Sequence, residues 1–469
     1  MTRTTPAIRL LQTAVVAACL VLGAACAGDD PAATTSTSGP EATVTTTSTT
    51  SGAGSVTDPV GNIGVDPVSR TIRLGVLADL SGSFASLSID VTDALGVYWD
   101  GVNDTGGVQG WTVELVIADT RGDPGQWLQA YEDLEPQVLA IAQAFGSRNN
   151  AEVLDAYRAD TMLVVPLSWY SGWPFDDVDG GLLLEQYTNY CIEAMNAVDF
   201  AVDNGAASLA IATDADLYGS DAGAGASYAA DFYALPVAYD GTAQIRVGEE
   251  LSVVVRSIVE SGADWTFLAT SPSTSAQILA GAVQLGYQGV FIGATPSYDP
   301  RLLDSASAEL FSSRFFQSAY VAPWGTDVPG IREMMGAMAT VYPDRRPSDA
   351  FIVGWNAGVT MRSVLASAIG SNDLTRRGML RAANGIETVP FGGSAPDQRY
   401  TGEPTDFVTR ASAVYKPDLD AYQAAGGFDQ RLTDPDASTG SILVRDFTTG
   451  EAATLFDFTA PCHPIGDGG

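Results

Sequence analysis

The apolar residues of the chain fall into short runs that alternate with stretches of helical periodicity. The first run covers residues 74–78 and is nearly unbroken, as expected for a strand covered on both faces. Residues 91–102 place apolar side chains at helical spacing, and residues 111–118 return to strand-like alternation. This order predicts a β-α-β unit whose first loop lies at the carboxyl edge of a parallel sheet, where α/β proteins usually bind ligands. An α/β domain of any other function would show the same pattern.

The alternation continues through most of the chain. Residues 138–145 and 162–166 are predicted strands on either side of a helix at 149–160, and a helix from about 190 to 204 leads to a second series. That series has predicted strands at 209–213, 265–269, 290–293 and 316–321, helices near 330–342, 350–368 and 374–384, and a tail rich in loops and strands. Two such series in about 400 residues predict an α/β protein of two lobes, each a mostly parallel sheet flanked by helices.

The first 25 residues have the pattern of a signal peptide. Arg3 and Arg9 precede an apolar run at 10–25, which is shorter than the roughly 20 residues of a spanning helix and suits a secretory signal. Residues 22–26, Leu-Gly-Ala-Ala-Cys, resemble a lipobox, which predicts that Cys26 is lipidated and becomes the first mature residue. Residues 16–19 match locally as well, but cleavage before Cys19 would leave an apolar stub, so we favour Cys26. Secretion without a lipid is the alternative.

Residues 26–68 predict a flexible tether. They are rich in Thr and Ser and contain almost no large apolar side chains. Such a segment cannot bury enough surface to offset the entropy lost on ordering. We therefore expect it to hold the folded part away from a membrane or cell wall.

Charge and composition exclude several classes of function. The formal charge is −33, and no basic stripe is present to meet nucleic acid phosphates. His463 is the single histidine and Lys416 the single lysine, so a histidine-rich zinc site and a phosphate-binding loop are excluded, and a serine triad would need a histidine near the end of the chain. We predict no metal, no cofactor and no enzymatic activity. An exported hydrolase with paired carboxylates is an alternative, which loss of activity on His463→Ala or on replacing one carboxylate would support.

Beyond the lipobox the sequence contains two cysteines, Cys191 and Cys462. Disulfides persist in exported proteins, so these two residues can form a bridge. Geometry decides whether they do, and two free thiols are the alternative.

Several turns resemble those of one known family. They are Leu80-Ser81-Gly82 after the first strand, the Asp-x-x-x-Asp-Pro turn at 119–124, the Asp-x-x-x-Tyr-Gly segment at 214–219 and the helix entry at 347–351. Over about residues 71–420 their order is similar to that of the type I periplasmic solute-binding proteins of ABC importers, especially the branched-chain amino-acid (Leu/Ile/Val) binding group. The resemblance implies two α/β lobes joined by three crossovers, with ligand in the cleft. The lobes would be 69–190 with about 320–395, and about 191–319 with about 396–469.

The resemblance also implies a set of cleft residues. By position they are Ser147, Leu167, Ser168, Trp169, Tyr218, Ser271 and Thr295. Hydroxyls at strand ends or helix starts, such as Ser147 and Ser168, can take a carboxylate. Amino-acid binders of the family usually carry an acid near the position of Thr295, so the neutral residue there departs from the family's pattern. Trp169, Tyr170 and Trp173 predict an aromatic surface for a larger or more apolar ligand, although each could equally pack in the core.

These observations predict an exported, lipid-anchored monomer that captures a small organic solute, an amino acid or a related compound, and delivers it to the permease of an ABC importer. Lobe closure around the solute is the mechanism expected of such proteins. The alternative is a receptor-like sensor on the same fold that acts on a separate membrane partner. Co-purification with a permease or with a signalling protein would distinguish the two.

Overall fold

The computed structural model describes residues 63–246 and 248–466. The predicted signal peptide, Cys26 and most of the predicted tether lie outside these residues. The last residues assigned to the tether differ from that expectation, because Val65–Asp66 form β1 and pair antiparallel with β2. None of the helices in the described ranges is long and apolar enough to cross a membrane.

The first sheet is built from the first predicted series of strands. Its order is β1-β2-β4-β5, with β3 on β2, and every pair except β1–β2 is parallel. The strands are β2 (Thr71–Ala78), β3 (Thr112–Asp119), β4 (Ala140–Phe145) and β5 (Val164–Leu167). The connecting helices are α1 (Ala85–Asp104), α2 (Pro124–Leu134), α3 (Ser147–Glu152) and α4 (Leu154–Asp160). The single helix predicted at 149–160 is therefore two helices, interrupted at Val153.

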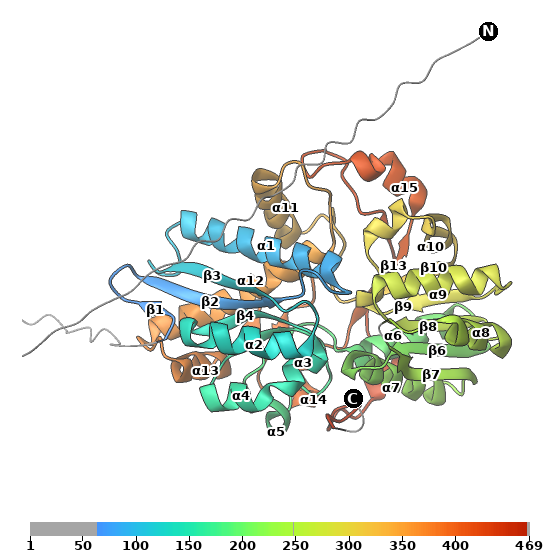
Figure 1. Cartoon of the computed structure of the whole chain (residues 1–469), viewed down its shortest axis with the longest axis horizontal. Helices are drawn as coiled ribbons and strands as arrows, with labels where there is room; N and C mark the ends of the chain where they lie inside the picture. The colour runs from blue at the N-terminus through green and yellow to red at the C-terminus, as the bar shows by residue number, and fades with distance from the viewer. Residues whose placement is uncertain (1–62, 247, 467–469) are drawn as a thin grey trace, which may run out of the picture. The chain divides into compact units, whose positions relative to one another are not determined.

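Three helices from late in the chain complete this lobe. They are α11 (Pro329–Val341), α12 (Ala350–Gly370) and α13 (Arg376–Asn384), and α12 lies against α1 (Figure 1). The two helices approach so closely that a Cβ atom at Gly354 would lie 1.9 Å from the backbone oxygen of Val91. Beside this contact, the rings of Tyr98 and Trp355 pack edge to face with centroids 4.9 Å apart.

The second sheet has seven strands in the order β14-β13-β10-β9-β8-β6-β7. These are β6 (Leu209–Asp214), β7 (Val237–Ile245), β8 (Trp265–Ala269), β9 (Val290–Gly293), β10 (Phe315–Ala319), β13 (Ser412–Pro417) and β14 (Ser441–Thr448). The five strands from β7 to β10 pair in parallel, and β13 and β14 add an antiparallel edge. The sequence did not predict β7 or the helix after it.

Helices cover this sheet and connect its strands, and short elements lie in both lobes and in the segments between them. The helices are α6 (Tyr190–Asp203), α7 (Leu217–Phe232), α8 (Ser252–Ser261), α9 (Pro272–Gln284), α10 (Ala308–Arg314), α15 (Leu419–Ala424) and α16 (Glu451–Leu455). The remaining short elements are α5 (Asp176–Asp179), α14 (Pro404–Phe407), β11 (Thr388–Val389), β12 (Gln398–Arg399), and the 3-10 turns η1 (Glu135–Gln137), η2 (Thr295–Ser297), η3 (Pro300–Asp304) and η4 (Gly427–Asp429).

The chain passes between the two sheets three times: after β5, after β10, and between α13 and β13. The connecting segments contact one another. Thr188 forms an isolated bridge with Thr409, and the Ala322 N–H donates to the Ser394 carbonyl oxygen over 2.8 Å. Three adjacent connections of this kind provide a hinge about which two lobes can close.

Cys191 in α6 and Cys462 in the C-terminal segment form a disulfide. Hydrogen bonds hold the same segment on the loop after β5: the Tyr170 hydroxyl donates to the His463 carbonyl oxygen over 2.6 Å, and the Cys462 N–H donates to Ser171 Oγ over 2.9 Å. The C-terminal segment thus links α6 to a loop of the first lobe.

Removing this bridge should lower the free energy of unfolding. The loop that the bridge closes spans a sequence separation of 271 residues. In the chain-entropy model such a loop gives at most roughly 5 kcal/mol, and measured losses are typically about 2–5 kcal/mol. Urea unfolding of the double variant Cys191→Ser, Cys462→Ser should show this loss. Reducing agent should destabilise the wild type equally and leave the variant unchanged, and a variant as stable as the wild type would contradict the expectation.

Candidate functional site

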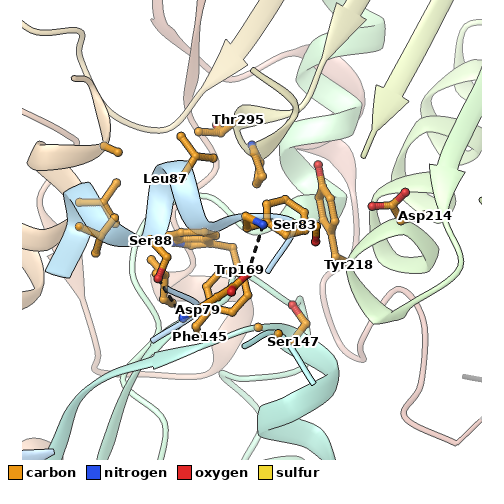
Figure 2. Close-up of a pocket in the computed structure, with 18 of the residues that line it drawn as sticks. Asp79, Ser83, Leu87, Ser88, Phe145, Ser147, Trp169, Asp214, Tyr218 and Thr295 are labelled. Carbon is orange, nitrogen blue, oxygen red and sulfur yellow. Dashed lines mark hydrogen bonds between the residues drawn. The ribbon is translucent and has the colours of Figure 1, made fainter. Parts of the chain in front are cut away.

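A cavity of about 580 Å³ lies between the two sheets. Its walls come from the loops at the carboxyl ends of β2, β4 and β5 in the first lobe and of β6, β7 and β9 in the second. Figure 2 shows Ser147 and Tyr218 reaching this space from opposite lobes. The arrangement matches the general rule that α/β sheets bind ligands beyond the carboxyl ends of their strands.

The turn after β2 is held by Asp79. Its buried carboxylate accepts hydrogen bonds from the backbone N–H groups of Gly82, over 2.5 Å, and Phe84, over 3.1 Å. A side chain at Gly82 would not fit, because its Cβ atom would lie 2.6 Å from Asp79 Oδ1 and 2.8 Å from the Arg121 carbonyl oxygen. The Ser-Gly turn seen in the sequence therefore exists for a steric reason, and it places Ser83 and Phe84 in the cavity wall.

Aromatic side chains from both lobes form much of the wall. They are Phe84, Phe145, Trp169, Tyr190, Tyr218, Tyr298, Tyr320 and Tyr415. Trp169 lies 4.4 Å from Tyr320 between ring centroids, and Tyr190 lies 4.5 Å from Tyr218. The ring of Phe84 in the first lobe contacts that of Tyr218 in the second, with centroids 6.5 Å apart. This wall suits a solute with an apolar or aromatic body.

Thr295 is tied to a buried acid. Its backbone N–H and its hydroxyl donate to Glu193 Oε1 over 2.8 and 2.5 Å, while Glu193 Oε2 has no hydrogen-bond partner among the described residues. Burial raises the pKa of Glu193 to about 8, against the opposing effect of the Thr295 hydrogen bonds. An acid does therefore stand beside Thr295, but it comes from α6, far away in sequence.

The charged groups of the wall separate by depth. Asp214, at the end of β6, is buried, and this burial, with the nearby Asp216 carboxylate, raises its pKa well above the usual range. The arginines of the wall, Arg121, Arg148 and Arg246, are exposed. Burial thus disfavours negative charge on Asp214, and positive charge lies at the edge of the cavity.

Five of the seven predicted cleft residues line the cavity: Ser147, Leu167, Trp169, Tyr218 and Thr295. Ser168 lies behind Ser147, with 2.7 Å between their hydroxyl oxygens, and does not itself reach the cavity wall. Ser271 caps α9 by accepting from the Thr274 N–H, and it too lies outside the wall.

Of the two places considered for Tyr170 and Trp173, the pocket and the core, the structure has both side chains in the core. Both side chains are buried in the core of the first lobe, where their ring centroids lie 4.9 Å apart. The sequence analysis missed Phe84, Tyr190 and Tyr320, although Phe84 follows the Ser-Gly turn directly and could have been found from it. Among the described residues, no group of histidines, cysteines and acids could hold a metal ion.

Comparisons with known proteins agree with this architecture. A family model described as periplasmic binding protein matches residues 71–418. A comparison with curated proteins found no match.

Several solved structures share the fold. A fatty acid ABC transporter substrate-binding protein from Thermomonospora curvata superposes with a TM-score of 0.74 at 24% identity, covering 84% of this chain and 96% of that one. A branched-chain amino acid ABC transporter protein from Thermus thermophilus with bound valine gives a TM-score of 0.65 at 13% identity, covering 83% and 98%. An extracellular ligand-binding receptor from Verminephrobacter eiseniae gives 0.65 at 17% identity, covering 75% and 98%. At these identities the likeness concerns the fold. Together with the family match over most of the chain, it establishes that this chain belongs to the periplasmic binding protein family, in the type I group that includes the branched-chain amino-acid binding proteins.

Proposed function

We propose that this protein is an extracytoplasmic solute-binding lipoprotein that captures a small organic solute by lobe closure and delivers it to an ABC importer. The observation that carries the proposal is the cavity of about 580 Å³ whose walls come from both lobes. A solute in that cavity contacts both lobes at once, so its binding energy favours the closed arrangement. A permease can then distinguish the loaded form from the empty one.

The residues of the cavity wall also indicate which kind of solute it binds. Its aromatic surface is larger than a short aliphatic side chain requires, and several of its polar groups lie in the loops at strand ends. We infer an amino acid or a related compound with a sizeable apolar body. Two solved structures of the same fold have names that refer to a fatty acid and to bound valine. Both compounds combine an apolar body with a carboxylate, which supports a solute of this kind.

The first experiment is a set of thermal melts of the purified exported protein with amino acids, organic acids, short peptides, nucleosides and sugars. A solute at about 100 times its dissociation constant should stabilise the folded state by about 2.7 kcal/mol. A shift confined to one chemical class supports solute binding and identifies the class. The absence of any shift, with no retained solute in native mass spectrometry, would contradict the proposal.

Shortening Phe84 should weaken solute binding, since its ring contacts Tyr218 across the cavity. We expect Phe84→Ala to raise the dissociation constant about tenfold, equivalent to about 1.4 kcal/mol. Titration calorimetry with a solute found in the melts measures the change. Phe232→Ala is the matched control, because Phe232 is 38% exposed and lies outside the cavity wall. Equal affinities of the two variants would argue against this cavity as the binding site.

The stability of the second lobe should depend on the protonation of Glu193. Folding raises the pKa of its buried carboxyl group from 4.5 to about 8, so this contribution to stability is fully present below pH 4.5 and is lost as the pH rises through 8. Glu193→Gln stays neutral, and we expect its free energy of unfolding, relative to the wild type, to increase between about pH 5 and about pH 8.

Urea unfolding at several pH values measures this difference. Glu114→Gln is the control, because Glu114 forms an ion pair with Arg73 in which both side chains are at least half exposed. Its stability relative to the wild type should not follow the trend of Glu193→Gln. Parallel pH profiles for the wild type and Glu193→Gln would show that Glu193 does not titrate in this range.

A further inference from the structure

A tryptophan outside the cavity is connected to its wall by hydrogen bonds. Trp173 is 1% exposed, lies in the loop after β5, and donates from Nε1 to Ser168 Oγ over 3.0 Å. An indole N–H can only donate, so Ser168 must accept this bond. The direction of the first link is therefore fixed by chemistry.

Ser168 also determines the direction of the second hydrogen bond. It is fully buried, and its other side-chain neighbour among the described residues is Ser147, with 2.7 Å between the two hydroxyl oxygens. The geometry alone allows either serine to donate. A buried hydroxyl proton without a partner is costly, and Ser147 is the acceptor within reach, so Ser168 donates to Ser147.

Ser147 stands at the cavity end of these bonds. Trp173, Ser168 and Ser147 together supply three polar hydrogens, whereas two links join them. With both links running toward the cavity, the O–H of Ser147 remains without a partner within this chain of hydrogen bonds. Ser147 lines the cavity, so this hydrogen is available to a solute.

We propose that Trp173, acting through Ser168, orients Ser147 as a hydrogen-bond donor, and that the solute presents an acceptor oxygen, such as a carboxylate, at this wall. Trp173 is thus a positioning residue that touches no solute. This inference rests on the proposed function. It explains why a tryptophan in the core of the first lobe has its indole N–H directed toward a serine instead of toward a backbone carbonyl.

The test uses two probes with the same apolar body, 3-phenylpropanoate and 3-phenylpropylammonium. The first carries acceptor oxygens and the second carries only donors. For the wild type we expect the carboxylate to bind at least about tenfold more tightly than the amine. In Trp173→Phe, Ser168 no longer receives the indole bond and can accept from Ser147, so the donor is lost. The carboxylate should then bind about 3- to 10-fold more weakly, the effect of one hydrogen bond, and the amine should bind no more weakly than before.

Two variants separate positioning from a general loss of packing. Ser168→Ala removes the hydroxyl that could accept from Ser147, so this variant should keep the wild-type affinity ratio, in contrast to Trp173→Phe. Trp99→Phe shortens another buried tryptophan of the first lobe whose Nε1 makes no hydrogen bond among the described residues, and it should leave the ratio unchanged. A purely structural role of Trp173 would instead change the affinities for both probes alike, and that result would overturn the inference.

A measurement without solute tests the chain of hydrogen bonds itself. In a ¹H–¹⁵N spectrum, the signal that disappears in Trp173→Phe is the Trp173 indole N–H, and Ser168→Ala should shift it because the acceptor is gone. An unmoved signal overturns the inference. The inference is also overturned if the amine binds more tightly than the carboxylate. The same holds if the carboxylate does not bind while other solutes of the panel do. If no solute of any class binds, the proposed function fails, and the spectrum alone decides whether the hydrogen bonds from Trp173 to Ser147 exist.

Discussion

The contact between Gly354 and Val91 is the constraint on which the two-lobed architecture depends. The backbones of α12 and α1 approach so closely there that a Cβ atom at residue 354 would overlap the Val91 carbonyl oxygen. Docking of α12 on α1 assigns a late part of the chain to the first lobe, whereas β13 and β14 return to the second sheet. Three connections between the lobes follow from this, and with them the hinge and the cavity.

The cavity combines a fixed frame with buried acids. Asp79 has its carboxylate occupied by the backbone of its own turn, which fixes the wall at Ser83 and Phe84. Burial raises the pKa values of Asp214 and Glu193, so it disfavours negative charge on these two side chains. The formal charge of −33 therefore overstates the negative charge at the cavity.

Most strands could be predicted because they are buried parallel strands, whose apolar runs differ clearly from the helical spacing around them. Strand β8 was predicted at its observed residues, whereas β7 was missed because its residues alternate between partly buried and exposed and include Asp240 and Gly241. In the site, loops directly after strands were found, since their position follows from topology. Glu193 was missed because its proximity to Thr295 arises from packing between segments 102 residues apart. For Trp173 the choice between pocket and core stayed open, because composition does not show which side of a loop faces the core.

The bond between Cys191 and Cys462 has a consequence for the biogenesis of the protein. Its two cysteines are separated by 271 residues, and the second lies in the last segment that the structure describes. If the chain is exported from its N-terminus as proposed, the first cysteine reaches the oxidising compartment while nearly all of the second lobe is still to follow. The bridge can form only once translocation has delivered residue 462, so the covalent closure of the fold comes after the strands of both sheets have been exported.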